Sequence, residues 1–369
     1  MSANVWFITG ATGSLGREIL PRVAAADAKA EMVLLVRGAD DDAVEARVAE
    51  LDRFVRNYWS GSIRGQVTPL RGDVALPRLG LEPRAYESLA RRVTHIVHAA
   101  ATIRLNAPED EARRINVGGT REVLRLAGCA PRLSRLAHVS TAYVAGDRTG
   151  RILECELRQG QRFLNSYEAS KCEAEELVRR CMGYLPVTVF RPSIIVGDSA
   201  DGHTCNFSTI YYPLRKIAQG CVEEIPGPPE APIDLIPVDH VARCIVELAI
   251  EPRRRSETYH IAAGPERCVP VRELVEAARR LNGCAGLPQL HFVPVPRADA
   301  PRTRPLAAHF TYLGYPKAFD DTALARDLGD AGRPDPRTYL ARVLDFCRDT
   351  DWGARLPWEP RPCATPSLN

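Results

Sequence analysis

A tyrosine and a lysine four residues apart are the side chains of this chain best suited to acid–base chemistry. They stand in the segment Tyr167–Lys171, which reads Tyr-Glu-Ala-Ser-Lys. In a helix, this spacing places both side chains on one face. An ammonium beside a phenol stabilises the phenolate, so we expect Lys171 to lower the pKa of Tyr167 from its usual value of about 10. Tyr167 would then act as the general acid for a carbonyl group that receives a hydride.

Two hydroxyl groups precede this pair, at the end of a predicted strand. The segment His138–Val144 reads His-Val-Ser-Thr-Ala-Tyr-Val. We predict that Thr141 donates a hydrogen bond to the substrate oxygen, with Ser140 as the alternative donor. Asn116 is a polar residue in the middle of a helical pattern. We expect it either to hold a water that links Lys171 to solvent or to make a hydrogen bond within its own helix.

A glycine-rich segment, Thr9–Gly16, follows the first predicted strand and reads Thr-Gly-Ala-Thr-Gly-Ser-Leu-Gly. Glycine allows a tight turn and a close approach of the backbone to a pyrophosphate. The N-terminus of the helix that follows offers free N–H groups to phosphate. The spacing of these glycines differs from the Gly-x-Gly-x-x-Gly fingerprint of many dehydrogenases. The predicted cofactor contacts in this loop are Gly10, Thr12, Gly13, Ser14, Leu15 and Gly16.

The residue after the second predicted strand indicates which dinucleotide binds. An acidic side chain there accepts a hydrogen bond from a ribose 2′-hydroxyl and favours NAD. Arg37 stands at that position, and its planar guanidinium suits a 2′-phosphate. We therefore predict NADPH as the cofactor. The alternative is that Arg37 faces solvent while Asp40 or Asp41 contacts the ribose.

Two further strand ends contribute predicted cofactor contacts. Asp73, followed by Val74, comes after the third strand. Its carboxylate would accept from the adenine amino group, or else it is a simple turn aspartate. The small side chains of Ala99, Ala100 and Ala101 follow the fourth strand and would let the cofactor lie against the edge of the sheet.

The elements that must position these residues alternate between strands and helices, as expected for βαβ units around a parallel sheet. Ligands bind at the carboxyl ends of such strands. The predicted strands are Val5–Thr9, Met32–Val36, Gln66–Leu70, His95–Ala99, Leu133–Val139 and Val187–Phe190. The predicted helices are Leu15–Ala25, Ala43–Tyr58, Tyr86–Arg91, Glu109–Leu126 and Tyr167–Arg180.

The pattern changes after Gly197, where Gly, Pro and aromatic residues become frequent. We predict helices at Phe207–Gln219, Val238–Ile250, Val271–Leu281 and Thr338–Arg348, with strands at Thr258–Ala262 and Leu290–Val295. The fold prediction is an α/β doubly wound parallel sheet with a smaller C-terminal lobe. Residues 1–197 and 238–264 form the dinucleotide-binding domain, 198–237 and 265–350 the substrate lobe, and 351–369 an irregular tail.

Composition narrows the class of protein. The chain has 369 residues, 45% of them apolar and 26% charged, and 49 basic residues almost balance 46 acidic ones. This balance gives no reason to expect nucleic acid as a partner. No apolar run is long enough to span a membrane and no signal peptide is recognisable, so we expect a cytoplasmic protein. The eleven cysteines and eight histidines show no metal-ligand spacing, and no metal is predicted.

Longer segments resemble the extended short-chain dehydrogenase/reductases, and within them the fatty acyl reductase (male-sterility) and thioester reductase group. The resemblance covers residues 4–250 well and the remainder loosely. The segments that carry it are His98–Leu105, Asn116–Thr120, His138–Val144, Asn165–Lys171, Phe190–Gly197 and Asp234–Asp239. It implies a catalytic triad of Thr141, Tyr167 and Lys171. It also implies that the Gly10–Gly16 loop, Arg37, Asp73, Asn116, Pro192, Ser193 and Ile194 contact NADPH.

The chain departs from this group in three respects. Ser14 replaces the usual aromatic residue of the glycine loop. No long C-terminal region like that of eukaryotic fatty acyl reductases follows residue 300, and no adenylation or carrier domain precedes the reductase. We therefore expect an acyl thioester substrate bound to coenzyme A or to a separate acyl carrier protein, reduced to an aldehyde and then possibly to an alcohol.

Three alternative functions remain open. One is a ketone reductase or hydroxyl dehydrogenase acting on a hydrophobic or polyketide-like intermediate. A sugar-nucleotide epimerase or dehydratase is disfavoured by Arg37, because those enzymes typically keep a tightly bound NAD. A nucleotide sensor without activity is disfavoured by the intact set of Thr141, Tyr167 and Lys171.

Overall fold

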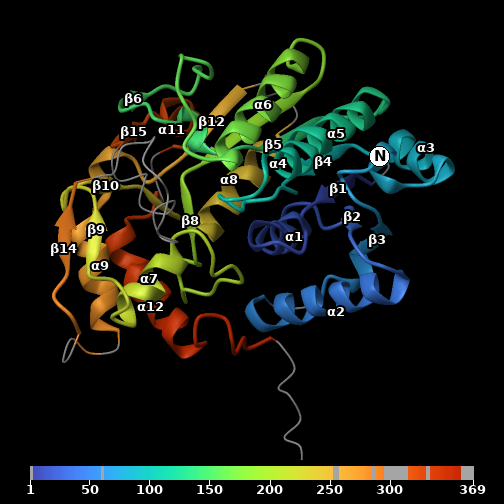
Figure 1. Ribbon diagram of the computed structural model, residues 1–369. Helices are drawn as coiled ribbons and strands as arrows, with labels where there is room; N and C mark the ends of the chain where they lie inside the picture. The colour runs from blue at the N-terminus through green and yellow to red at the C-terminus, as the bar shows by residue number, and fades with distance from the viewer. Residues whose placement is uncertain are drawn as a thin grey trace, which may run out of the picture.

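Seven strands form one parallel sheet at the centre of the protein, in the order β12-β7-β5-β4-β1-β2-β3 (Figure 1). The computed structural model describes residues 3–59, 62–251, 257–281, 283, 287–294, 315–329 and 333–358. The strands of the sheet are β1 (Val5–Thr9), β2 (Glu31–Val36), β3 (Val67–Arg71), β4 (His95–His98), β5 (Arg135–Val139), β7 (Val187–Pro192) and β12 (Glu257–Ile261). The strand order reverses between β1 and β4, which is where such sheets bind ligands.

The described residues form helices on both faces of the sheet and in a second core beside it. The helices are α1 (Ser14–Ala26), α2 (Asp41–Tyr58), α3 (Pro83–Arg92), α4 (Glu109–Ala112), α5 (Gly119–Gly128), α6 (Ser166–Cys181), α7 (Tyr211–Ala218), α8 (Val238–Ile250), α9 (Val271–Arg280), α11 (Thr322–Leu328) and α12 (Pro336–Asp349). Helices α1, α2 and α8 bury apolar side chains against one face, and α3, α5 and α6 against the other. The predicted doubly wound Rossmann architecture is confirmed.

A second apolar core lies beside the sheet and is built from α7, α9 and α12 (Figure 1). Four short strand pairs accompany it or link it to the sheet. They are β6 (Gly150–Ile152) with β15 (Lys317–Phe319), β8 (Ile194–Val196) with β11 (Leu235–Pro237), β9 (Glu224–Pro226) with β14 (His291–Val293), and β10 (Pro232–Ile233) with β13 (Val269–Pro270). The predicted division into two lobes at residues 197, 238 and 264 stays a prediction.

Two predicted helices differ from the structure. The helix expected over Glu109–Leu126 is interrupted by a π-helical segment, Arg113–Gly118, between α4 and α5. The helix expected to begin at Phe207 begins only at Tyr211, because Thr209 has a φ of 50° and lies in the left-handed region. The basic run Arg253–Arg255 lies outside the described residues.

The described part of the C-terminal tail packs against α2. Residues 351–358 form turns, and Trp358 is buried with its ring 5.0 Å from Phe54 and edge-on to it. The rest of the predicted irregular tail, residues 359–369, lies outside the described residues. None of the helices that the structure describes combines the length and apolar character needed to cross a lipid bilayer.

Candidate active site

A cleft of about 1680 Å³, part of it open to solvent, lies at the carboxyl ends of the strands. It brings together most of the predicted site. The predicted residues that line it are Gly10, Thr12, Gly13, Ser14, Leu15, Gly16, Ala99, Ala101, Thr141, Tyr167, Lys171, Pro192, Ser193 and Ile194. The remaining predicted residues, Arg37, Asp73, Val74, Ala100 and Asn116, do not line it.

The glycine loop fits a pyrophosphate by its backbone geometry. Gly10 has a φ of 76°, and a Cβ added there would lie 2.7 Å from the backbone of Ala99 and Ala100. A Cβ at Gly16 would lie 2.2 Å from the Gly10 carbonyl oxygen. Gly13 begins α1 without a side-chain cap, so the N–H groups of the first turn face the cleft unblocked. Any larger residue at Gly10 or Gly16 would therefore distort the loop. With glycine at both positions, the loop keeps a conformation that can hold a dinucleotide.

Tyr167 and Lys171 sit on the first turns of α6. Asn165 caps this helix by accepting from the Glu168 N–H at 2.9 Å, which fixes where the helix begins. Tyr167 makes a side-chain hydrogen bond with Thr141, which follows β5. Lys171 is buried, and its Nζ donates to the Val139 carbonyl at 2.7 Å. Three functional groups from two elements thus converge in the cleft.

Lys171 is not among the groups that shift the pKa of Tyr167 here, and its expected stabilisation of the phenolate stays a prediction. Burial raises the pKa of Tyr167 to about 12, and the hydrogen bond with Thr141 opposes that rise only in part. The ammonium of Lys171 is directed at the Val139 carbonyl, while burial lowers the pKa of Lys171 to about 8. Tyr167 is therefore held as a protonated phenol at neutral pH.

The Asn116 side chain makes its hydrogen bonds outside its own helix, unlike the alternative of a bond within it, and its expected role in holding a water stays a prediction. Its amide nitrogen donates to the Ser170 hydroxyl at 2.9 Å and to the Thr102 carbonyl at 3.2 Å, while its oxygen accepts from the Thr102 N–H at 2.8 Å. These bonds leave its own helix and tie the loop after β4 to α6. The π-helical segment directs the buried side chain toward both partners. Asn116 thereby positions the helix that carries Tyr167.

Ser140, the alternative donor, is already engaged. Its hydroxyl donates to Glu175 at 2.7 Å. Glu175 is fully buried and also forms an ion pair with the fully buried Arg191 at 2.7 Å. Arg179 adds a further bond to the same carboxylate at 2.8 Å. Since Thr141 instead bonds Tyr167, the geometry favours Thr141 as the donor to a substrate oxygen.

Two buried histidines, one on β4 and one on β5, lie beneath this centre. His98 and His138 are neighbours in the sheet register, with ring centroids 5.5 Å apart. Burial and the nearby Lys171 charge lower the pKa of His98 to about 3 and that of His138 well below its usual value. Both rings are therefore neutral, and Lys171 is the positive charge next to Tyr167.

The groups around Arg37 bear on the predicted cofactor choice. Arg37 is exposed at the end of β2. Asp40 caps α2 by accepting from the Ala43 N–H at 2.8 Å, and Asp41 lies 3.3 Å from the Arg71 guanidinium. The two acidic alternatives thus have partners of their own. Arg71 is a second cation at this edge that the sequence alone did not single out.

Asp73 and Val74 occupy the turn after β3. The Asp73 carboxylate accepts from the Ala75 N–H at 2.9 Å, as a turn aspartate does. Val74 is buried against Gly119, where an added Cβ would lie 3.0 Å from it. The contacts of Asp73 therefore match the alternative that it shapes a turn.

Aromatic and apolar residues in and just before α7 contribute to the cleft and to the second core. Ile210 and Tyr211 line the cleft, and the Tyr211 hydroxyl accepts from the Gly197 N–H at 2.7 Å. Leu214 and Phe207 pack in the second core only, whereas Ile210 and Tyr211 contact both that core and the cleft. The cleft residues not predicted are Arg17, Ile103, Leu105, Val139, Tyr143, Ile195, Thr204, Cys205, Asn206, Ser208 and Thr209. Most lie in irregular segments, where no periodicity could have signalled them.

One cluster of possible metal ligands appears among the described residues. Glu18, Asp198 and His203 have ligand atoms within 4.8 Å of one another. The His203 ring bonds the Glu18 carboxylate at 2.7 Å and Asp201 at 2.6 Å, and Glu18 also pairs with Arg22. Bonding to these carboxylates raises the pKa of His203 to about 9 despite its burial. The cluster is an ion-pair network that joins α1 to the loop after β8.

The sheet, the glycine loop at β1–α1 and the Tyr-x-x-x-Lys pair define an extended short-chain dehydrogenase/reductase, an oxidoreductase class that binds a nicotinamide dinucleotide. The chain belongs to the male sterility protein family, whose model matches residues 8–245.

Relatives of this chain include a fatty acyl-CoA reductase and a lipopeptide synthase. The chain is 27% identical over 306 residues to the fatty acyl-CoA reductase wat of Drosophila melanogaster. It is 31% identical over 274 residues to the isonitrile lipopeptide synthase of Streptomyces coeruleorubidus. Each match covers 73% of this chain but only 59% of the first relative and 18% of the second, so the chain spans less than two thirds of either.

Solved structures with a similar fold include a reductase domain and an epimerase. The terminal R domain from the myxalamid PKS-NRPS biosynthetic pathway superposes with a TM-score of 0.80 and 26% identity, over 95% of this chain and 92% of that one. UDP-glucuronic acid 4-epimerase from Bacillus cereus superposes with a TM-score of 0.68 and 15% identity, over 96% and 100%. That second likeness concerns the fold alone, so function must be argued from the site.

Proposed function

We propose that this protein reduces acyl thioesters with NADPH, releasing an aldehyde and a free thiol. The observation that carries the proposal is the convergence of Thr141, Tyr167 and Lys171 in the cleft that begins at the glycine loop. Similarity to a fatty acyl-CoA reductase, and to the R domain of the myxalamid pathway over nearly its whole length, supports a thioester rather than a sugar nucleotide as substrate.

The residues of the chain have separate tasks in this reaction. When the cofactor binds, the backbone of Gly10–Gly16 would hold the pyrophosphate, Pro192, Ser193 and Ile194 would contact the nicotinamide half, and Lys171 would hold its ribose. Bound NADPH would supply the hydride. Thr141 and Tyr167 donate hydrogen bonds to the carbonyl oxygen as it gains negative charge. Tyr167 protonates that oxygen or the departing thiolate, and Lys171 stabilises the phenolate that remains.

The reaction balances as thioester, hydride and one proton giving aldehyde and thiol. A second hydride and proton would carry the aldehyde to an alcohol. The acyl group would arrive as a thioester of coenzyme A or of a carrier protein, and the thiol that leaves would be that of its carrier.

Thiol release tests this function directly. Purified protein with NADPH and a panel of acyl-coenzyme A and acyl-carrier thioesters should release free thiol in step with NADPH consumption. A thiol reagent follows the release, and mass spectrometry identifies aldehyde or alcohol. If ketones of similar shape are reduced while no thioester reacts, the protein is a ketone reductase and the proposal is wrong.

Cofactor choice gives a second expected result. Because Arg37 stands at the end of β2 and both acidic neighbours have other partners, kcat/KM should favour NADPH over NADH by at least about tenfold, which corresponds to about 1.4 kcal/mol. Arg37→Asp should reverse or abolish the preference, whereas Arg47→Asp, in the exposed middle of α2, should not. Equal use of both cofactors by the unaltered protein contradicts the assignment.

A further inference from the structure

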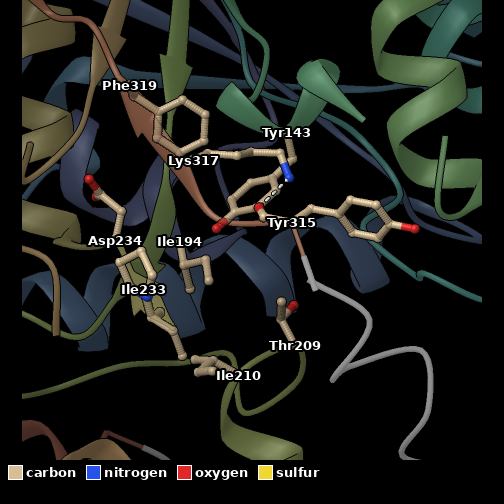
Figure 2. A pocket seen from close by; sticks show the side chains of 10 residues that line it. Tyr143, Ile194, Thr209, Ile210, Ile233, Asp234, Tyr315, Lys317 and Phe319 are labelled. Carbon is tan, nitrogen blue, oxygen red and sulfur yellow. Dashed lines mark hydrogen bonds between the residues drawn. The ribbon is translucent and has the colours of Figure 1, made fainter. Parts of the chain in front are cut away.

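A smaller pocket opens beside the active-site cleft (Figure 2). The empty space at this pocket, counted together with the solvent-filled part of its mouth, is about 560 Å³. The cleft and this pocket share four wall residues, Tyr143, Ile194, Thr209 and Ile210. Since Tyr143 is two residues from Thr141, the pocket begins next to the point where a substrate carbonyl would bind. A group attached to that carbonyl would enter it.

The pocket contains a buried cation, Lys317, at the start of β15. Its side chain crosses the pocket between Phe319 and Tyr315 (Figure 2). Lys317 is 8% exposed, and its Nζ donates one hydrogen bond, to the Tyr315 carbonyl at 2.9 Å. Among the described residues it forms no ion pair with a carboxylate. An ammonium has three donor hydrogens, and a buried one without a counter-ion is costly.

Charges beyond the pocket do not replace that counter-ion. Glu168 and Asp147 lie near enough to favour the charged form of Lys317, while burial lowers its pKa to about 8. Asp147 is already paired with Arg162. Glu168 accepts from the Leu164 N–H at 2.9 Å. Lys317 is thus still a cation at neutral pH, with donor capacity to spare.

Asp234, the carboxylate of the same pocket, has no capacity for a ligand. One of its oxygens accepts from the Ser193 hydroxyl at 2.5 Å and the Ala263 N–H at 2.9 Å. The other accepts from the Gly264 N–H at 3.1 Å and faces the Cys268 thiol at 3.9 Å. Donors therefore surround the carboxylate, and the unused hydrogen-bonding capacity of the pocket is that of a donor.

The backbone of the shared wall is strained at Thr209. This β-branched residue has a φ of 50°, a left-handed conformation that such residues rarely adopt. Strain of this kind gathers at ligand-binding positions. Its position in both the pocket and the cleft links the two spaces.

Resting on the proposed thioester reduction, we propose that Lys317 selects acyl groups that carry a carboxylate a short distance from the thioester carbonyl. The carboxylate enters the smaller pocket and accepts a hydrogen bond from the Lys317 ammonium. It thereby acts as the counter-ion that no described residue provides. The apolar walls, Ile194, Ile233 and Phe319, hold the methylene groups between the two ends. The substrates favoured are half-thioesters of short dicarboxylic acids.

Matched substrates test this selection. Coenzyme A thioesters of dicarboxylic acids with four to six carbons are compared with those of monocarboxylic acids of the same lengths, with NADPH saturating. For the unaltered protein, at least one carboxylate-bearing substrate should show kcat/KM at least about tenfold above its neutral partner. Lys317→Met keeps an unbranched side chain, one atom shorter, and removes its charge, so it should bring this ratio close to one.

Controls separate the possible failures. Lys29→Met, at an exposed position that does not line the cleft, should keep the ratio of the unaltered protein. Thermal melting shows whether the Lys317→Met variant folds. If the variant does not fold, the proposal is judged from the unaltered protein alone, by the ratio of kcat/KM between the carboxylate-bearing and the neutral substrate. Two results would overturn the selection by Lys317. In one, the unaltered protein reduces all thioesters without preferring those that carry a carboxylate. In the other, the preference survives in Lys317→Met. Absence of thiol release from every thioester instead refutes the proposed function.

Discussion

Tyr167→Phe should lower turnover by about a hundredfold or more while NADPH binding changes little. The substitution keeps the ring that fills the site and removes the phenol proton together with one of the two donors to the carbonyl oxygen. Burial holds the pKa of Tyr167 at about 12, so the group lost is a phenol that is protonated throughout the neutral range. Steady-state kinetics with NADPH, and a fluorescence titration of NADPH, measure the two effects separately.

Two companion variants sharpen this prediction. Lys171→Ala should damage both turnover and NADPH binding, because Lys171 is expected to hold the nicotinamide ribose as well as to stabilise the phenolate. Tyr184→Phe alters a tyrosine that is 72% exposed and should leave both unchanged. Near-normal turnover in Tyr167→Phe would show that another group donates the proton.

Arg191→Met should reduce the free energy of unfolding by about 3–5 kcal/mol. The change leaves the buried Glu175 carboxylate with Ser140 and the partly exposed Arg179 as partners. It also removes the bonds from Arg191 to the carbonyls of Glu154 and Glu156. Urea unfolding followed by circular dichroism measures the loss.

The matched control is an ion pair of the same chemistry at the surface. Arg158 pairs with Glu176 through two bonds but is half exposed. Arg158→Met should therefore cost no more than about 1 kcal/mol. If the two variants were equally stable, the buried pair would contribute nothing beyond a surface contact.

The long elements were predictable because their residue patterns are regular and local. Strand Val5–Thr9 and helix Val238–Ile250 have the predicted bounds, and the other predicted strands of the sheet are correct to within a few residues. Each is a continuous apolar run or an amphipathic repeat. The three-residue strands β8 and β11 were not predicted, since neither has a period and each exists only through its pairing with the other.

Site residues that belong to one local motif could be predicted from the sequence. Roles that depend on contacts between distant segments could not. Tyr167, Lys171 and the glycine loop are recognisable by their spacing. The role of Asn116 depends on a π-helical turn, which has no sequence signature, and on Thr102 and Ser170 from two other segments. Lys317 enters the pocket only because β15 pairs with β6, far away in the sequence.

The order of the strands also bears on how the protein is synthesised. Six of the seven sheet strands end by Pro192, whereas β12, which covers the edge formed by β7, begins at Glu257. At a translation rate of about 5–20 residues per second, the ribosome needs roughly 3–13 seconds to add the intervening segment. During that interval Val187 and Val189 lie on an unpaired edge strand of the nascent chain. Such an edge invites pairing with other chains, so rapid, crowded expression should favour aggregation, and slower synthesis at low temperature should favour the native fold.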